Sequence, residues 1–220
     1  NLNRNIKDVD MKINLTPDYP IGAKRVLFSD HYYPALARDN VHLNTKGVLR
    51  FSEEGVIDNN DELTKVDVVI YGTGFKTNPF LADIDVWGTQ LTSLRDTWTD
   101  GAHAYLGVSV NGFPNLHLLY GPNTNLGHTS IIIMLEAQSD YALKLIQHID
   151  AESVLSCEIK RDIELEYNRE LQHRLSTMAF SKIANSWYKD CDKVTNNWMG
   201  GTKEYVKRMN SLDVKQYLFR

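Results

Sequence analysis

Hydrophobic residues along this 220-residue chain fall into two patterns, continuous short runs and runs with helical spacing. The segment 66–71, VDVVIY, is a nearly continuous apolar run rich in β-branched residues. Because its apolar residues do not alternate with polar ones, both faces should be covered, which predicts a strand of a parallel sheet. The segment 115–120, NLHLLY, predicts a second buried strand. Glycine-containing turns follow both segments.

Two longer segments have the spacing of amphipathic helices. In residues 129–150 the periodic apolar positions are Ile131, Met134, Leu135, Ala142, Leu145, Ile146 and Ile149. The adjacent Ile132 and Ile133 make the first turns of this helix apolar all round, which predicts a core helix. In residues 158–180, apolar residues at steps of four predict a second helix: Ile159, Ile163, Tyr167, Leu171 and Leu175.

The remaining segments give weaker patterns. Residues 1–20 are polar and contain Pro17 and Pro20, so a loop or leader is expected there. Short strands are expected at 25–28, 41–44, 48–52 and 56–57, a Ser29-Asp30 cap before a helix at 31–36, and irregular structure at 75–113. The tail from residue 185 mixes aromatic and polar residues and is broken by Gly200-Gly201.

Composition narrows the functional classes. With 24 basic and 28 acidic side chains and a net charge of −4, the sequence has no electrostatic signature of nucleic-acid binding. Two cysteines make no disulfide framework, so a reducing, cytoplasmic location is expected. No apolar run is long enough for a membrane span, so no membrane partner is expected. Seven histidines without metal-ligand spacing predict no metal site.

The turn Gly72-Thr73-Gly74 raises the question of phosphate binding. A dinucleotide-binding loop needs a third glycine and a following helix, but that glycine is absent and Pro79 stands where the helix should run. On the motif alone, a sharp turn after a strand is the simpler interpretation. The helix expected at 129 has no acidic residue in its first turn, which leaves room for an electron-rich ligand. The alternative is that Thr129 or Ser130 caps an ordinary core helix.

Four stretches together resemble the flavin-containing and Baeyer–Villiger monooxygenases. VDVVIYGTGF resembles their D-x-x-x-x-A-T-G-F segment, with Gly72 in place of the usual alanine. The other three stretches are PDYPIGAKRVLFSDHYYPALARDNVHL, GFPNLHLLYGPNTNLGHTSIIIMLEAQ and NSWYKDCDKVTNNWMGGTKEY. They cover most of residues 17–206 in the family's order, and the tail is most similar to hydroxyacetophenone-type enzymes.

The resemblance implies an α/β fold, a partial flavoprotein with two Rossmann-like domains that bind FAD and NAD(P). Residues 1–71 would end the NADPH-binding domain, and residues 72–220 would form the C-terminal half of the FAD-binding domain with its tail. The family's two glycine-rich fingerprints and its signature motif do not occur in this sequence. The chain is therefore expected to be a C-terminal portion, inactive alone, of an FAD- and NADPH-dependent monooxygenase.

The resemblance also implies roles for individual residues. Arg25 would be catalytic and steady an oxyanion beside the flavin, since arginine stays charged and has a fork of donors. Lys24 would contact the NADPH 2′-phosphate, and Trp187 would lie against the nicotinamide cofactor. Without the resemblance, Lys24-Arg25 would be a solvated pair and Trp187 a core aromatic. Further residues expected near the cofactors are Thr73, Gly74, Asn123, Asn125, Leu126, Thr129, Ser130 and Ile131.

Two other functions stay open at this point. One is an N-hydroxylating or disulfide-reductase-like flavoprotein relative, although Cys157 and Cys191 form no redox pair in sequence. The other is a binding or assembly module that keeps the fold without catalysis. For the monooxygenase, the partners would be O₂ and a small molecule, either a ketone or a compound with a soft heteroatom.

Overall fold

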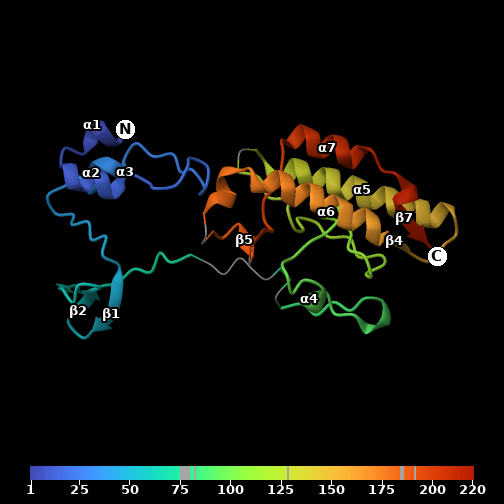
Figure 1. The fold of residues 1–220 in the computed structure, drawn as a ribbon, viewed down its shortest axis with the longest axis horizontal. Helices are drawn as coiled ribbons and strands as arrows, with labels where there is room; N and C mark the ends of the chain where they lie inside the picture. The colour runs from blue at the N-terminus through green and yellow to red at the C-terminus, as the bar shows by residue number, and fades with distance from the viewer. Residues whose placement is uncertain (75–79, 82, 128, 184–185, 191) are drawn as a thin grey trace. The chain divides into compact units, whose positions relative to one another are not determined.

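A computed structural model of the chain describes residues 1–74, 80–81, 83–127, 129–183, 186–190 and 192–220. The chain forms two compact units (Figure 1). Unit 1 contains Asn1–Pro20 and Val26–Phe75, and unit 2 contains Ile21–Arg25 and Lys76–Arg220. The short segment 21–25 is anchored by Ala23, which is fully buried. The assignment of residues 1–71 and 72–220 to NADPH- and FAD-binding domains stays a prediction.

Unit 1 contains three short helices and an antiparallel sheet. The helices are α1 (Leu2–Asn5), α2 (Val9–Leu15) and α3 (Tyr32–Leu36), and the strands are β1 (Val48–Ser52), β2 (Gly55–Asp58) and β3 (Leu63–Lys65) in the order β1-β2-β3. The strands predicted at 48–52 and 56–57 are confirmed. The N-cap residue of α3 is His31 and not the predicted Ser29-Asp30, although the Ser29 hydroxyl accepts hydrogen bonds from the N–H groups of His31 and Tyr32 at the start of the helix.

Four segments between residues 1 and 71 differ from the expectation. Residues 1–20 are partly helical, because the Asp8 side chain caps α2 by accepting from the N–H of Met11. Residues 66–71 form no strand, and Ile70 is 90% exposed. A strand needs a partner whose backbone pairs with its N–H and C=O groups, and among the described residues the sheet ends at β3. The segments 25–28 and 41–44 are likewise unpaired by any described strand.

Unit 2 is built on three helices that lie side by side, α5 (Ile131–Ala151), α6 (Arg161–Ser176) and α7 (Thr202–Asn210) (Figure 1). The strand β4 (Cys157–Ile159) pairs antiparallel with β7 (Tyr217–Phe219), and β5 (Lys189–Asp190) pairs with β6 (Lys193–Val194). Shorter elements are α4 (Leu94–Thr97) and the 3₁₀ turns η1 (Thr89–Leu91), η2 (Ala179–Lys182) and η3 (Val214–Gln216).

The main core of unit 2 lies between these helices. Its fully buried members include Met134, Tyr141, Leu145, Ile159, Leu171, Leu175, Tyr205 and Met209. A second, smaller core surrounds Trp98 and Phe113. Both helices predicted from apolar spacing are confirmed, although Ile159 belongs to β4 and α6 begins two residues later. Because each apolar stripe faces this core, periodicity was sufficient to find both helices.

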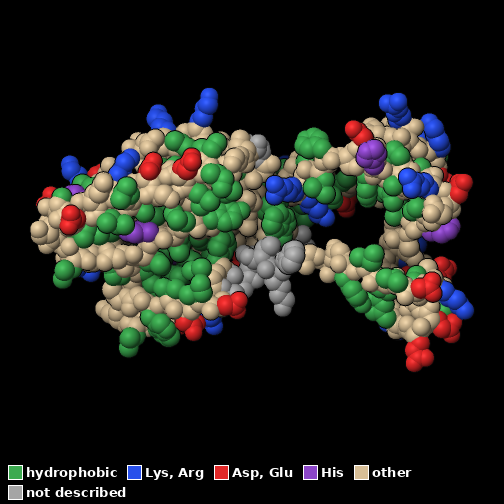
Figure 2. Space-filling view, turned by 180° about the vertical axis from the view of Figure 1, so that it is seen from behind, with side chains coloured by type: hydrophobic (Ala, Val, Ile, Leu, Met, Phe, Trp, Pro, Cys, Tyr) green, Lys and Arg blue, Asp and Glu red, His purple; other side chains and the backbone are tan. Residues whose placement is uncertain are grey.

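Two further expectations for unit 2 fail. The first turn of α5 is not core on all sides, since Ile132 is 56% exposed while Met134 is fully buried. Figure 2 shows hydrophobic side chains gathered over parts of the protein surface. On α5, Ile132, Ile133, Leu143 and Ile146 are exposed. Residues 115–120 form no strand: Leu118 is buried and donates its N–H to Val108, but Leu119 and Tyr120 are exposed.

Two classes of site are absent from the described part of the chain. No described helix is long and apolar enough to cross a membrane. Among the same residues, no group of three or more His, Cys, Asp or Glu side chains is placed to hold a metal ion.

Candidate functional site

A loop at residues 120–126 joins the 115–120 segment to α5. Tyr120 and Asn123 have left-handed backbone conformations, with φ of 59° each. The loop packs closely on the turn around Gly107, because a Cβ on Gly121 would lie 2.3 Å from the Gly107 carbonyl oxygen. Glycine at position 121 therefore allows two backbone segments to touch and sets how closely the loop packs on the Gly107 turn.

The loop is held by a second segment, residues 194–198, from the C-terminal tail. Asn125 and Asn197 form a parallel β-bridge, and the Asn125 N–H donates to the Asn196 carbonyl at 3.0 Å. The side-chain amide of Asn123 donates to the carbonyls of Val194 (2.6 Å) and Asn197 (3.1 Å). Since Asn123 is only 2% exposed, these bonds satisfy carbonyls that water cannot reach.

Three acceptor atoms beside this pairing are left over. Asn123 Oδ1, Thr195 Oγ1 and Asn196 Oδ1 are buried and have no hydrogen-bond partner among the described residues. Asn123 and Thr195 are both almost completely inaccessible to solvent. Buried polar atoms are normally paired, so these three unpaired atoms are places where an ordered internal water would be stabilised.

Arg25 acts on this region through its charge. Burial raises the pKa of the Tyr120 phenol, and the positive charge of Arg25 offsets part of that rise. Burial also raises the pKa of Tyr188, where a hydrogen bond with Trp187 and then the charge of Arg25 act in the opposite direction. Arg25 therefore lies within electrostatic range of both tyrosines, and all four residues belong to unit 2.

The two tyrosines link Arg25 to other predicted site residues. Tyr120 donates its hydroxyl hydrogen to Asn125 Oδ1 at 2.9 Å, and Asn125 in turn donates to Asn197 Oδ1 at 3.0 Å. The Trp187 ring lies 4.6 Å from the Tyr188 ring, at an interplanar angle of 35°. Trp187 is 42% exposed, so the interpretation as a fully buried core aromatic is wrong.

The start of α5 also has features of a ligand site. Ser130 caps the helix by accepting the Ile132 N–H at 3.3 Å, and no acidic side chain stands in the first turn. The partial positive charge of the helix N-terminus is therefore not neutralised by this helix's own residues. Thr129 and Ser130 are exposed, and the Thr129 hydroxyl bonds to that of Thr202 at 2.5 Å. Leu126 is buried in the core, and Ile131 packs against the same cluster.

The other predicted residues are placed differently. Thr73 and Gly74 are exposed residues of unit 1, and Gly74 adopts a left-handed conformation with φ of 82°. Lys24 is exposed and lies next to Arg25 in unit 2. Unit 2 thus brings together Arg25, Trp187 and the 123–126 loop, while the glycine turn belongs to the other unit.

Three participants were missed from the sequence: Tyr120, Tyr188 and Asn197. Tyr120 was assigned to the expected strand at 115–120, where it had no separate role. The role of Asn197 depends on its pairing with Asn125, 72 positions away in the sequence, and no local pattern indicates such a pairing. For Tyr188, its position next to Trp187 in the NSWY motif was the available signal.

Comparisons with known proteins show what the chain as a whole is similar to. No protein-family model matches the chain. The FAD-binding monooxygenase ktnD of Aspergillus niger is 40% identical over 212 residues, which is 94% of this chain and 35% of that protein. A Baeyer-Villiger monooxygenase of Pseudomonas aeruginosa is 39% identical over 188 residues, 85% of this chain and 36% of its own length.

Solved structures give the same result. A steroid monooxygenase bound to NADP has a TM-score of 0.85 at 25% identity, covering 99% of this chain and 43% of its own. A complex of OTEMO with FAD and NADP has a TM-score of 0.86 at 29% identity, covering 100% and 42%.

The chain is therefore a relative of flavin-dependent monooxygenases. More narrowly, it corresponds to the C-terminal part of proteins named Baeyer-Villiger or FAD-binding monooxygenases, and its fold is part of their FAD- and NADP-binding Rossmann-like fold. It spans little more than a third of the length of these two curated relatives, 35% and 36%.

Proposed function

We propose that this chain supplies the C-terminal part of the cofactor site of an FAD- and NADPH-dependent monooxygenase. The observation that carries the proposal is the convergence in unit 2 of an exposed cation, Arg25, whose charge acts on Tyr120 and Tyr188, and the 120–126 loop, which pairs through its backbone with residues 194–198. The names of the relatives support it, because the Aspergillus niger protein is described as FAD-binding and a neighbouring structure holds FAD and NADP. The substrate would be a ketone or a compound with a soft heteroatom, together with O₂.

The residues present fit a flavin. The α5 N-terminus, with Thr129 and Ser130 exposed beside it, would favour a ring edge that gains electron density. FAD, when bound and reduced by NADPH, would supply the redox chemistry with O₂. Arg25 would hold an oxyanion of the reacting system, because its guanidinium stays charged and offers several donors at once.

The remaining predicted residues would serve the nicotinamide cofactor and the domain connection. Trp187 offers a partly exposed aromatic face supported by Tyr188, which suits stacking against a planar ring. Lys24 would pair with the 2′-phosphate as an exposed cation. Thr73 and Gly74 would form the crossover between the two dinucleotide-binding domains. Without a disulfide framework among the two cysteines, we place the protein in the cytoplasm.

The test uses Arg25→Ala in the protein expressed from its natural gene. The yield of oxygenated product should fall about 10²- to 10³-fold, the usual effect of losing one preorganised donor. Reduction of the flavin by NADPH should change by no more than about twofold, because it does not need the oxyanion contact. Arg25→Lys should recover little activity, since lysine lacks the fork of donors.

The matched control is Arg161→Ala, which removes an exposed arginine from the first turn of α6. Both steps should stay close to the unsubstituted rates in this variant. Stopped-flow absorbance separates flavin reduction from oxygen transfer. A normal product yield in Arg25→Ala would show that Arg25 is only a surface cation and would remove the catalytic assignment.

A further inference from the structure

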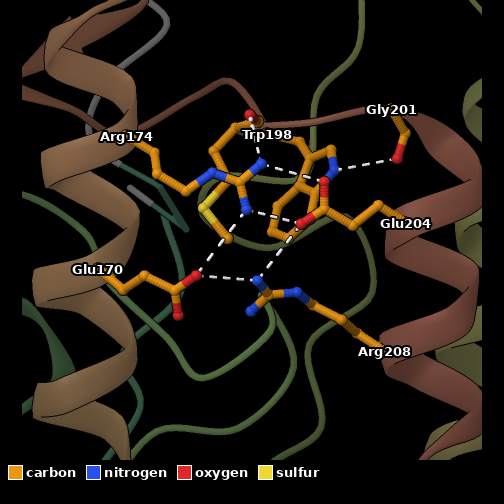
Figure 3. Close-up of polar contacts among 7 residues, drawn as sticks. Glu170, Arg174, Trp198, Gly201, Glu204 and Arg208 are labelled. Atoms are coloured by element: carbon orange, nitrogen blue, oxygen red, sulfur yellow. Dashed lines mark hydrogen bonds and ion pairs between the residues drawn. The ribbon is translucent and has the colours of Figure 1, made fainter.

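A cluster of four charged side chains joins α6 to α7 (Figure 3). Arg174 of α6 forms two parallel bonds to Glu204 of α7, at 2.6 Å from Nη1 and 3.0 Å from Nη2. Arg208 of α7 bonds to Glu170 of α6 at 2.9 Å and to Glu204 at 3.3 Å. A bidentate arginine–carboxylate pair fixes orientation as well as distance, so the cluster sets how the two helices meet.

The cluster also holds the segment that precedes α7. The Arg208 guanidinium lies over the Trp198 ring, 5.7 Å from its centroid, and the indole N–H of Trp198 donates to the Gly201 carbonyl at 3.3 Å. A Cβ on Gly200 would lie 2.3 Å from Glu204 Oε2. The backbone at Gly200 therefore runs directly against the paired carboxylate.

Trp198 connects the cluster to the 123–126 loop. Its backbone N–H donates to the Asn125 carbonyl at 2.9 Å, and the preceding residue, Asn197, forms the β-bridge with Asn125. The backbone carbonyl of Asn197 also accepts a hydrogen bond from the Asn123 side-chain amide. A continuous set of contacts therefore runs from the α6–α7 ion pairs, through Trp198, to the 120–126 loop.

We propose that Arg174 and Arg208 are positioning residues for the cofactor-facing loop, and that they act through Trp198 and Asn197. The proposal rests on the proposed function, because it gives that loop its role. The arginine and glutamate side chains are about one-third exposed, from 30% for Arg208 to 47% for Glu170. Solvent screening makes such pairs weak contributors to global stability, so their main effect should be on local geometry.

The decisive variant is Arg174→Gln in the protein expressed from its natural gene. Hydrogen exchange measured by mass spectrometry should quicken about tenfold in peptides that contain the Asn125 and Trp198 amides, which open when the pairing loosens. Exchange in the middle of α5, around Leu145, should not change. The dissociation constant for FAD, followed by flavin fluorescence, should rise about tenfold.

The matched control is Arg169→Gln on the same helix. Arg169 pairs with Glu166 of the same helix at 3.0 Å, and both side chains are strongly exposed, so this ion pair lies within α6 and does not join it to α7. Neither loop exchange nor FAD binding should change. Arg174→Lys keeps the charge without the fork of donors, so its loop exchange and its dissociation constant for FAD should lie between those of Arg174→Gln and Arg169→Gln. This variant also guards against the case in which Arg174→Gln fails to fold.

The outcomes separate the two proposals. Faster exchange throughout unit 2, including α5, would mean general destabilisation and overturn the positioning role. Unchanged exchange in the two loop peptides would also overturn it. If the unsubstituted protein bound no FAD, the proposed function would fail, while the exchange result would still decide whether the ion pairs hold the loop.

Discussion

Asn123 offers the sharpest test of how the candidate site is built. Replacing it by alanine removes both side-chain bonds that it donates, to the carbonyls of Val194 and Asn197. It also places an alanine at a φ of 59°, in the left-handed region that asparagine tolerates better. The change therefore affects hydrogen bonding and backbone conformation together, and a second variant is needed to separate them.

The size of the effect follows from these contacts. Two buried bonds contribute about 1 kcal/mol each, and leaving their carbonyls unpaired in a 2% exposed site adds about 1 kcal/mol more. The left-handed conformation of alanine costs about 1 kcal/mol. We expect Asn123→Ala to lower the free energy of unfolding by about 3–4 kcal/mol. Asn123→Gly should be about 1 kcal/mol less harmful, because glycine adopts this φ without strain.

Urea unfolding followed by tryptophan fluorescence measures the free energy of unfolding of unit 2, which contains Asn123. All four tryptophans, Trp87, Trp98, Trp187 and Trp198, belong to unit 2. The control is Asn210→Ala at the end of α7, an exposed site where a change within about 0.5 kcal/mol is expected. A loss below about 1 kcal/mol in Asn123→Ala would show that these two bonds do not hold the loop.

Two further predictions concern close packing and pH. In Gly107→Ala, the new Cβ would lie 2.1 Å from Thr124 Cγ2 at a φ of 70°, so the free energy of unfolding of unit 2 should fall by about 1–3 kcal/mol in the same urea assay. The control is Gly127→Ala, where no described atom lies within 4 Å of the new Cβ. The hydrogen bond from Arg174 holds the pKa of Glu204 below its ordinary value, so the stability that this pair contributes is present above the unfolded pKa and is lost as pH falls through the folded pKa. The difference in unfolding free energy between the unsubstituted chain and Glu204→Gln should therefore shrink as the pH is lowered from neutrality; a difference that stays constant would contradict the role of this carboxylate.

Local patterns predicted the helices and failed for the buried strands. The apolar spacing in 129–150 and 158–180 was sufficient because a helix makes its backbone bonds within one segment. The run at 66–71 has the side chains of a buried strand, but strand formation depends on a partner elsewhere in the chain. No such partner occurs among the described residues, and the segment is exposed.

The candidate site divides in the same way. Resemblance identified Arg25, Asn123, Asn125 and Trp187, and unit 2 contains all four. The tail segment that pairs with the loop was not predicted, because a pairing of Asn125 with Asn197 has no sequence signature. The ion pairs between α6 and α7 were also not predicted, because the sequence pattern after the two glycines at 200–201 did not reveal α7.

The pairing of Asn125 with Asn197 has a consequence for biosynthesis. During translation the loop leaves the ribosome well before its partner, because 72 residues separate them. At about 5–20 residues per second, the loop waits about 4–14 s for the segment that fixes it. Throughout that interval the backbone groups of the loop lack their final partners, so the nascent chain cannot close this part of unit 2 until residue 198 has been made.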